Sequence, residues 1–139
     1  MASEDDTSPA AAKPPRRKPS HVGVPAIFEL ELCCQHLNAA YPEGFCYLVG
    51  SSIDRPDWRD VDVVLILPDE EFAREFPDVS GVSFEADPKW LINSISISLW
   101  IGKRTGLPVD FKIQSRSWAN DRHKGTRHAL GMRIARAVP

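Results

Sequence analysis

The sequence predicts an α/β (α+β) fold in which a small mixed β-sheet is flanked by helices. Two short apolar runs, residues 45–49 and 61–67, have the length and composition of buried strands. Residues 25–40 place apolar side chains at helical spacing, which gives a helix one face to bury. The chain of 139 residues is long enough for one domain around one core.

Local signals predict the elements in the first half of this domain. We expect the helix over residues 25–40 to end at Pro42 and Gly44, because neither residue continues a helix well. The strand over residues 45–49 follows directly. The run 61–67 is apolar almost throughout, which is typical of a central strand that is covered on both faces.

The middle of the chain contains one clear helix and one ambiguous segment. Residues 68–76 predict a helix, since a proline and three acidic side chains suit its first turn. In residues 87–106, alternating isoleucines and serines fit a strand, whereas Asp87 followed by Pro88 fits the start of a helix. We predict the helix, because the apolar residues of this segment also share one helical face.

Two further elements complete the expected fold. Residues 107–113 predict a short strand that carries Asp110 among apolar neighbours. Residues 117–136 predict a final helix, although Gly125 and Gly131 weaken it.

Three aspartates in these strands form the strongest functional signal. Asp60 and Asp62 stand at the start of the second strand, where residues two apart point to the same face. Asp110 could join them from the later strand. Because carboxylates of like charge are costly to hold together, a divalent cation would stabilise the group. Oxygen ligands without nearby Cys or His favour Mg²⁺ or Mn²⁺, the metals of phosphoryl and nucleotidyl transfer.

A Gly50-Ser51 turn after the first strand adds a phosphate-binding signal. Glycine lets the backbone approach a phosphate, and the Ser51 hydroxyl and neighbouring N–H groups can donate to it. Taken separately, each signal is more often an ordinary turn, a solvated strand edge or an ion pair. The three signals in this order are much more specific than any one of them.

This arrangement resembles the nucleotidyltransferase fold of the DNA polymerase beta superfamily, which includes minimal and aminoglycoside nucleotidyltransferases. The signature of that fold is an apolar strand ending in Gly-Ser or Gly-Gly, an Asp-x-Asp on the next strand and a third Asp on a later one. The resemblance implies that Gly50 and Ser51 hold the nucleotide phosphates. It implies that Asp60 and Asp62 bind metal. It also implies that Asp110 helps to bind metal and acts as the base toward the acceptor hydroxyl.

The segment after the Gly-Ser turn departs from the family pattern. Family members often continue with a basic helical turn that contacts phosphate. Here Ser52 and Arg55 are the further candidates for nucleotide binding, but Pro56 disfavours helix at Arg55 and shortens any such turn. Arg59 could instead pair with local carboxylates.

We therefore expect a single-domain, metal-dependent nucleotidyltransferase that moves a nucleoside monophosphate from an NTP to a hydroxyl acceptor and releases pyrophosphate. The acceptor could be a protein, an RNA end or a small molecule. The alternative is a catalytically inactive binding module of the same fold, such as an antitoxin-like regulator or an RNA-binding subunit. The presence of all three aspartates favours the enzyme, because carboxylates without a metal are costly.

The charge distribution divides the chain into a tail and a domain. Residues 1–20 are acidic, then rich in Ala and Pro, then basic, and we expect a disordered tail because they offer no periodic apolar side chains. Residues 21–139 form the nucleotidyltransferase-like domain.

Residues 54–78 are acidic and residues 116–136 basic, although the net charge is only −2. The basic segment is either a solvated surface or a site for triphosphate or acceptor. If it is only a surface, acceptor recognition would come from a partner or a homodimer.

Composition also predicts the compartment. Cys33, Cys34 and Cys46 lack zinc-type spacing and are expected as small buried side chains in a reducing environment. No stretch approaches the roughly 18–20 apolar residues that cross a bilayer. We therefore expect a cytoplasmic protein that does not contact a membrane.

Overall fold

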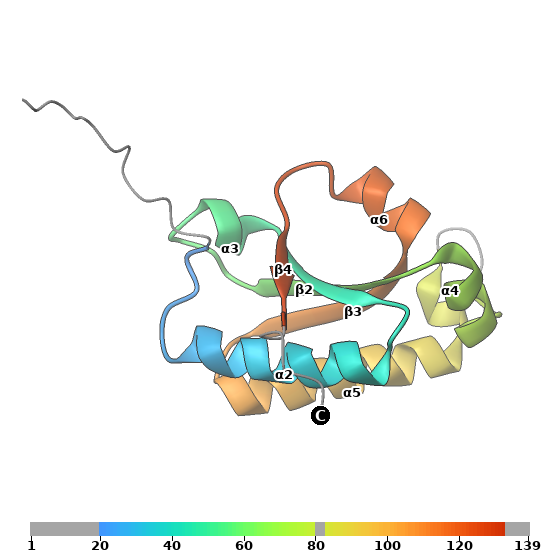
Figure 1. The fold of residues 1–139 in the computed structure, drawn as a ribbon, viewed down its shortest axis with the longest axis horizontal. Coiled ribbons are helices and arrows are strands. Elements are labelled where there is room, and N and C mark those ends of the chain that lie inside the picture. The colour runs from blue at the N-terminus through green and yellow to red at the C-terminus, as the bar shows by residue number, and fades with distance from the viewer. Residues whose placement is uncertain (1–19, 80–82, 133–139) are drawn as a thin grey trace, which may run out of the picture.

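The fold is a small mixed sheet with helices on both faces (Figure 1). It was obtained as a computed structural model, which describes residues 20–79 and 83–132. Within them the sheet has the strand order β3-β2-β1-β4. Its strands are β1 (Phe45–Val49), β2 (Val61–Leu67), β3 (Val109–Ser115) and β4 (His128–Leu130).

The pairing of the strands makes the sheet mixed. β2 runs parallel to β3, whereas β1 is antiparallel to both β2 and β4. β2 therefore lies inside the sheet, and β3 is an edge strand. This confirms the predicted α/β class and the central position of the second strand.

The helices divide between the two faces of the sheet. α2 (Ala26–Ala40) and α5 (Pro88–Thr105) lie side by side under one face, and the short helices α3 (Ser51–Asp54) and α6 (Arg116–Arg122) lie over the other (Figure 1). α4 (Asp69–Glu75) follows β2, and a 3₁₀ turn, η1 (Phe84–Ala86), precedes α5.

Burial on both faces explains the continuous apolar run of β2. On the side of α2 and α5, alternate residues such as Val63 and Leu65 join the main core. On the other side, Val64 and Ile66 pack with Ala119 of α6 in a smaller cluster. Polar side chains can therefore occupy β2 only at its start, where Asp62 lies.

The structure confirms the helix in the ambiguous segment. The Asp87 carboxylate accepts hydrogen bonds from the N–H groups of Lys89 and Trp90, at 2.9 and 3.0 Å, and so caps the start of α5. Trp90 is buried against the core. Capping and burial therefore prevail over the strand-like alternation.

The predicted helix over residues 117–136 is wrong. α6 ends at Arg122, and the chain returns as β4 beside β1. Asn38 of α2 fixes this return, because its side-chain amide donates to the carbonyls of Leu130 and Gly131. The end of the expected helix, residues 133–136, lies outside the described residues.

The predicted tail lies almost wholly outside the described residues, which begin at Ser20. The chain is already part of the domain there, since the N–H of His21 donates to the carbonyl of Ser52 at 2.7 Å and Val22 belongs to the core. All three cysteines are buried with free thiols. In the described part of the chain, no helix has the length and apolar character needed to cross a membrane.

Gly131→Ala should destabilise the protein strongly. Gly131 has φ +75°, and a Cβ there would lie 2.6 Å from the backbone nitrogen of Gln35 and 2.7 Å from the carbonyl oxygen of Cys34. Strain and overlap together should lower the free energy of unfolding by at least about 3 kcal/mol. Gly125→Ala is the matched control. A Cβ at Gly125 meets no atom within 4 Å, so its effect in urea denaturation should stay within about 0.5 kcal/mol. Equal losses in the two variants would contradict the close packing of the returning chain against α2.

Candidate functional site

Two of the three aspartates face each other across neighbouring strands. Asp62 of β2 and Asp110 of β3 are direct partners in the parallel register. Residues opposite each other on paired strands point to the same face, so both carboxylates lie on the face of α3 and α6. Asp60 is exposed, one residue before β2 and two residues from Asp62.

The Gly50 turn lies against one of these carboxylates. Val49, the last residue of β1, is the antiparallel partner of Asp62. Gly50 then has φ +85°, and a Cβ there would lie 2.5 Å from Oδ2 of Asp62. Both the backbone conformation and the close approach require glycine at this position.

The serines after Gly50 differ in exposure. Ser51 is half-buried at the start of α3, whereas Ser52 is fully buried and its hydroxyl has no hydrogen-bond partner within the described residues. Of the two predicted nucleotide-binding serines, Ser51 is thus the one with its side chain at the surface.

Arg55 lies just beyond this short helix. α3 ends at Asp54, and Arg55 has extended backbone angles, as predicted from the following Pro56. Its guanidinium pairs with the Asp57 carboxylate through two contacts of 3.1 Å, and both side chains are exposed. Arg55 therefore has a carboxylate partner outside the pair formed by Asp62 and Asp110.

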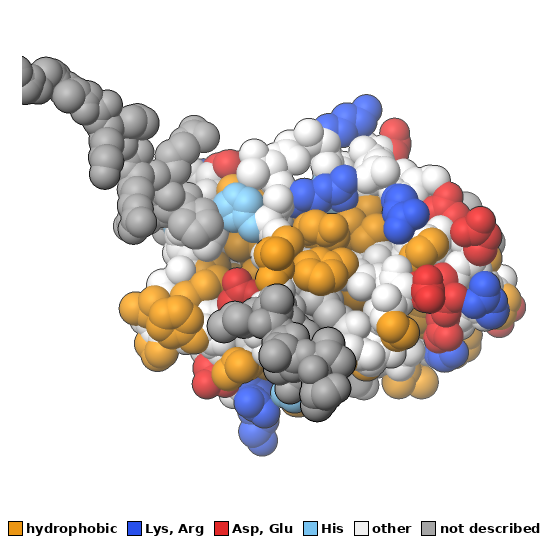
Figure 2. Space-filling view, in the orientation of Figure 1, with side chains coloured by type: hydrophobic (Ala, Val, Ile, Leu, Met, Phe, Trp, Pro, Cys, Tyr) orange, Lys and Arg blue, Asp and Glu red, His pale blue; other side chains and the backbone are white. Residues whose placement is uncertain are grey.

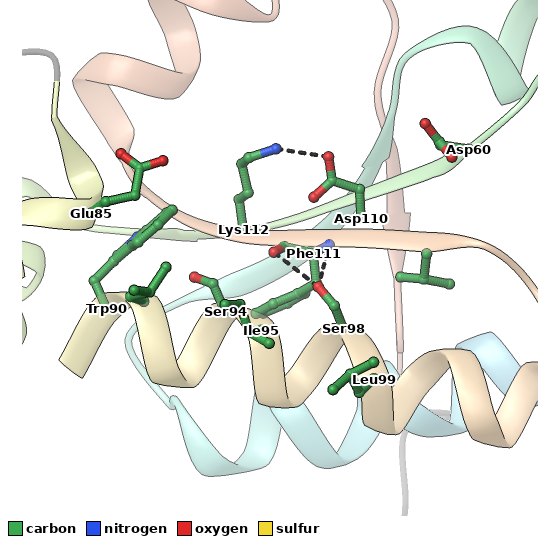
Figure 3. A pocket seen from close by; sticks show the side chains of 12 residues that line it. Asp60, Glu85, Trp90, Ser94, Ile95, Ser98, Leu99, Asp110, Phe111 and Lys112 are labelled. Atoms are coloured by element: carbon green, nitrogen blue, oxygen red, sulfur yellow. Dashed lines mark hydrogen bonds and ion pairs between the residues drawn. The ribbon is translucent and has the colours of Figure 1, made fainter. Parts of the chain in front are cut away.

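Lys112 is a site residue that the sequence reasoning missed. Its ammonium donates to Oδ2 of Asp110 at 2.7 Å (Figure 3). The signal was present, because Lys112 lies two residues after Asp110 on the same strand and so shares its face. This cation reduces the repulsion between the aspartates.

The remaining repulsion acts on Asp62. Partial burial raises the pKa of this carboxyl above its usual 3.8, and the negative charges of Asp110 and Asp60 raise it further. The positive charge of Lys112 acts in the opposite direction. Asp62 thus lies within the electrostatic field of both other aspartates.

Asp62 and Asp110 are the two carboxylates that the strand register places opposite each other. In residues 20–79 and 83–132, no group of three or more His, Cys, Asp or Glu side chains could hold a metal ion, so Asp60, Asp62 and Asp110 do not form such a group in this structure. Mg²⁺ is commonly bound by one or two carboxylates together with substrate phosphates and water. Asp62 and Asp110 provide such a carboxylate pair, with Asp60 nearby.

A cleft of about 420 Å³ adjoins Asp60 and Asp110 but not Asp62 (Figure 3). Asp60, Asp110 and Lys112 line one side of it. Helix α5 lines the other side, where Ile95 and Leu99 are more than half exposed. A molecule in this cleft would contact aliphatic surface and charged groups together.

Side chains of α5 fix the edge of β3 along this cleft. The Ser98 hydroxyl accepts from the N–H of Phe111 at 2.9 Å and lies 3.3 Å from its carbonyl oxygen. The indole N–H of Trp90 donates to the carbonyl of Ile113 at 2.8 Å. The strand that carries Asp110 is therefore attached to α5 by side chains on its outer edge.

Comparison with family models, with curated proteins and with solved structures gave no significant match. No comparison therefore identifies the class of protein, and its function has to be inferred from the site.

Asp62→Asn should make the metal-free protein more stable at pH 7. Because the folded-state pKa of Asp62 is raised, its contribution to stability is fully present below pH 3.8 and is lost as the pH rises through the raised value. Asparagine cannot ionise and avoids this loss. Thermal melts in EDTA should show the variant above wild type at pH 7, with the difference disappearing toward pH 3.8. Asp78→Asn, at an exposed aspartate beyond α4, provides the control. An Asp62→Asn variant that melts below wild type at pH 7 would mean that the carboxylate stabilises the fold.

Proposed function

We propose that this protein is a metal-dependent nucleotidyltransferase that moves a nucleoside monophosphate from an NTP to a hydroxyl acceptor. One observation supports this above all others. Asp62 and Asp110 are direct partners on parallel strands, and the Gly50 turn lies against Asp62. Gly50, Asp62 and Asp110, which are distant in the sequence, thus lie at the same end of the sheet.

Each group has a role that follows from its position. The Gly50 turn and the Ser51 hydroxyl would hold the nucleotide phosphates, since no side chain at residue 50 blocks their approach. Asp62 and Asp110, with Asp60, would hold Mg²⁺ or Mn²⁺. The metal would neutralise phosphate charge and help to activate the acceptor hydroxyl. Asp110 borders the cleft, where it would accept the proton of that hydroxyl.

The ion pair between Lys112 and Asp110 favours a second candidate function, that of a binding module without catalytic activity. Lys112 supplies a positive charge to Asp110, which would reduce the repulsion between the aspartates in a protein that binds no metal. A catalytically inactive binding module of this fold, such as an antitoxin-like regulator or an RNA-binding subunit, would need only this arrangement. The two functions differ in whether a divalent cation binds.

Asp62→Asn and Asp110→Asn should each reduce nucleotidyl transfer about 100-fold or more, because each removes a charge that the reaction requires. The assay supplies each α-labelled NTP in turn with Mg²⁺ or Mn²⁺, and offers the protein itself, RNA or small alcohols as acceptor. Transfer of label and release of pyrophosphate are both measured. Asp78→Asn, which changes an exposed aspartate beyond α4, should retain wild-type activity.

Metal binding provides a second and independent readout. Mn²⁺ should raise the melting temperature of wild type, by the equivalent of about 2.7 kcal/mol at a hundredfold excess over its dissociation constant. The two variants should lose this response. A wild-type protein that neither responds to Mn²⁺ nor transfers label would reject the enzyme and favour the binding module.

A further inference from the structure

A second cavity, of about 240 Å³, lies on the same face of the sheet as the aspartates. Phe45 and Tyr47 of β1 line it, together with Arg116 and Asn120 of α6 and Arg127 of the loop before β4. This volume is below the range of about 300–1,000 Å³ typical of whole small-molecule sites. The cavity therefore suits one unit of a larger ligand or a single small one.

Arg127 is held in this cavity by uncharged groups. Its guanidinium donates to the side-chain oxygen of Asn120 and lies 5.5 Å from the ring centroid of Tyr47. These contacts fix the side chain without neutralising it, and they leave most of its N–H donors free. Such an arginine is prepared to bind an oxyanion.

The charges around the cavity favour an anionic ligand. Neither Arg116 nor Arg127 forms an ion pair within the described residues. Glu43 also lines the cavity, so its charged side chains are two cations and one anion. The pKa of the nearby His123 is lowered mainly by burial and then by positive charges, among them that of Arg127.

The cavity also offers aromatic surface. The rings of Phe45 and Tyr47 have centroids 5.7 Å apart. In the view of Figure 2, apolar side chains gather in the middle of the molecule, with Lys and Arg side chains beside them toward α6. Aromatic rings beside arginines are the usual means of binding the base and the phosphate of a single-stranded nucleotide.

The position of the cavity connects it with the aspartates. Tyr47 is the partner of Val64, which lies two residues after Asp62 on β2. Two residues of a strand span about 7 Å. One extended ligand can therefore reach both the cavity and the carboxylates along this face.

We propose that this cavity binds a nucleotide unit of the acceptor, with the phosphate at Arg116 and Arg127 and the base against Phe45 and Tyr47. The acceptor would then be the end of a nucleic acid strand or a free nucleotide, and neither a protein nor an uncharged alcohol. The role of the bound nucleotide as acceptor rests on the proposed nucleotidyl transfer. The binding of a nucleotide in the cavity does not depend on that function.

This assignment separates two kinds of arginine in the basic segment. Arg122 lies 4.4 Å from the ring centroid of Trp118, which itself packs on Phe84. Arg116 and Arg127 instead line the cavity. Only these two should contribute to nucleotide binding.

The test measures binding of a fluorescein-labelled five-nucleotide RNA to the full chain in EDTA at low salt, by fluorescence anisotropy. Arg127→Gln should weaken binding about tenfold, because it removes charge-assisted hydrogen bonds to phosphate. Arg127→Lys keeps the charge but loses the planar fork of the guanidinium. Its affinity for the RNA should therefore lie between those of wild type and Arg127→Gln. Arg104→Gln is the matched control, since Arg104 is an exposed arginine of α5 that pairs with Glu29. It should bind as wild type does.

Competition identifies the source of the nucleotide. Displacement of the labelled RNA by adenosine monophosphate would indicate a free nucleotide, whereas displacement by unlabelled RNA alone would indicate a strand end. Either result supports the proposal, and displacement by inorganic phosphate alone overturns it. Equal losses in Arg127→Gln and Arg104→Gln would also overturn it, since they indicate binding by general charge.

The two proposals can fail separately. Asp62→Asn should lose transfer and the Mn²⁺ response but keep the affinity for RNA in EDTA. Arg127-dependent RNA binding in a protein without transfer would reject the enzyme and leave the cavity assignment in place. Transfer to RNA that is unchanged in Arg127→Gln would overturn the assignment and leave the enzyme.

Discussion

The parallel pairing of β2 with β3 is the constraint on which the candidate site depends. Its register makes Asp62 and Asp110 direct partners, although they lie far apart in the chain. Because side chains alternate between the faces of a sheet, a slip of one residue would move one carboxylate to the opposite face. That face is the main apolar core, where an unpaired carboxylate would be costly. Core packing and site geometry therefore select the same register.

The same face of the sheet contains two environments that differ in charge. Near the start of β2, the aspartates and the Gly50 turn form an acidic end whose charge Lys112 reduces. Toward the start of β1, arginines lie beside aromatic rings. Neighbouring regions of opposite charge would orient a charged ligand along the face, with its anionic groups toward the arginines.

Local sequence signals predicted most elements because short-range chemistry determines them. The strand β1, the strand β2 and the cap of α5 at Asp87 each follow from apolar runs or capping residues. β4 was missed, because its three residues are defined by pairing with β1 and by Asn38, which lies 92 positions from Leu130. The cavity at Arg127 likewise depends on which segments meet in space, whereas Lys112 lies two residues from Asp110 on one strand and could have been recognised from the sequence. The aspartates were found because their order along the chain has a recognisable pattern.

The attachment of β3 to α5 has a consequence for solubility. An edge strand normally presents unpaired backbone groups, which invite sheet-to-sheet association between molecules. Here the Ser98 hydroxyl and the Trp90 indole already bond to backbone groups of Phe111 and Ile113 on that edge. Asp110 and Lys112 add charge to the same strand. The edge at β3 should therefore have little tendency to pair with a strand of another chain.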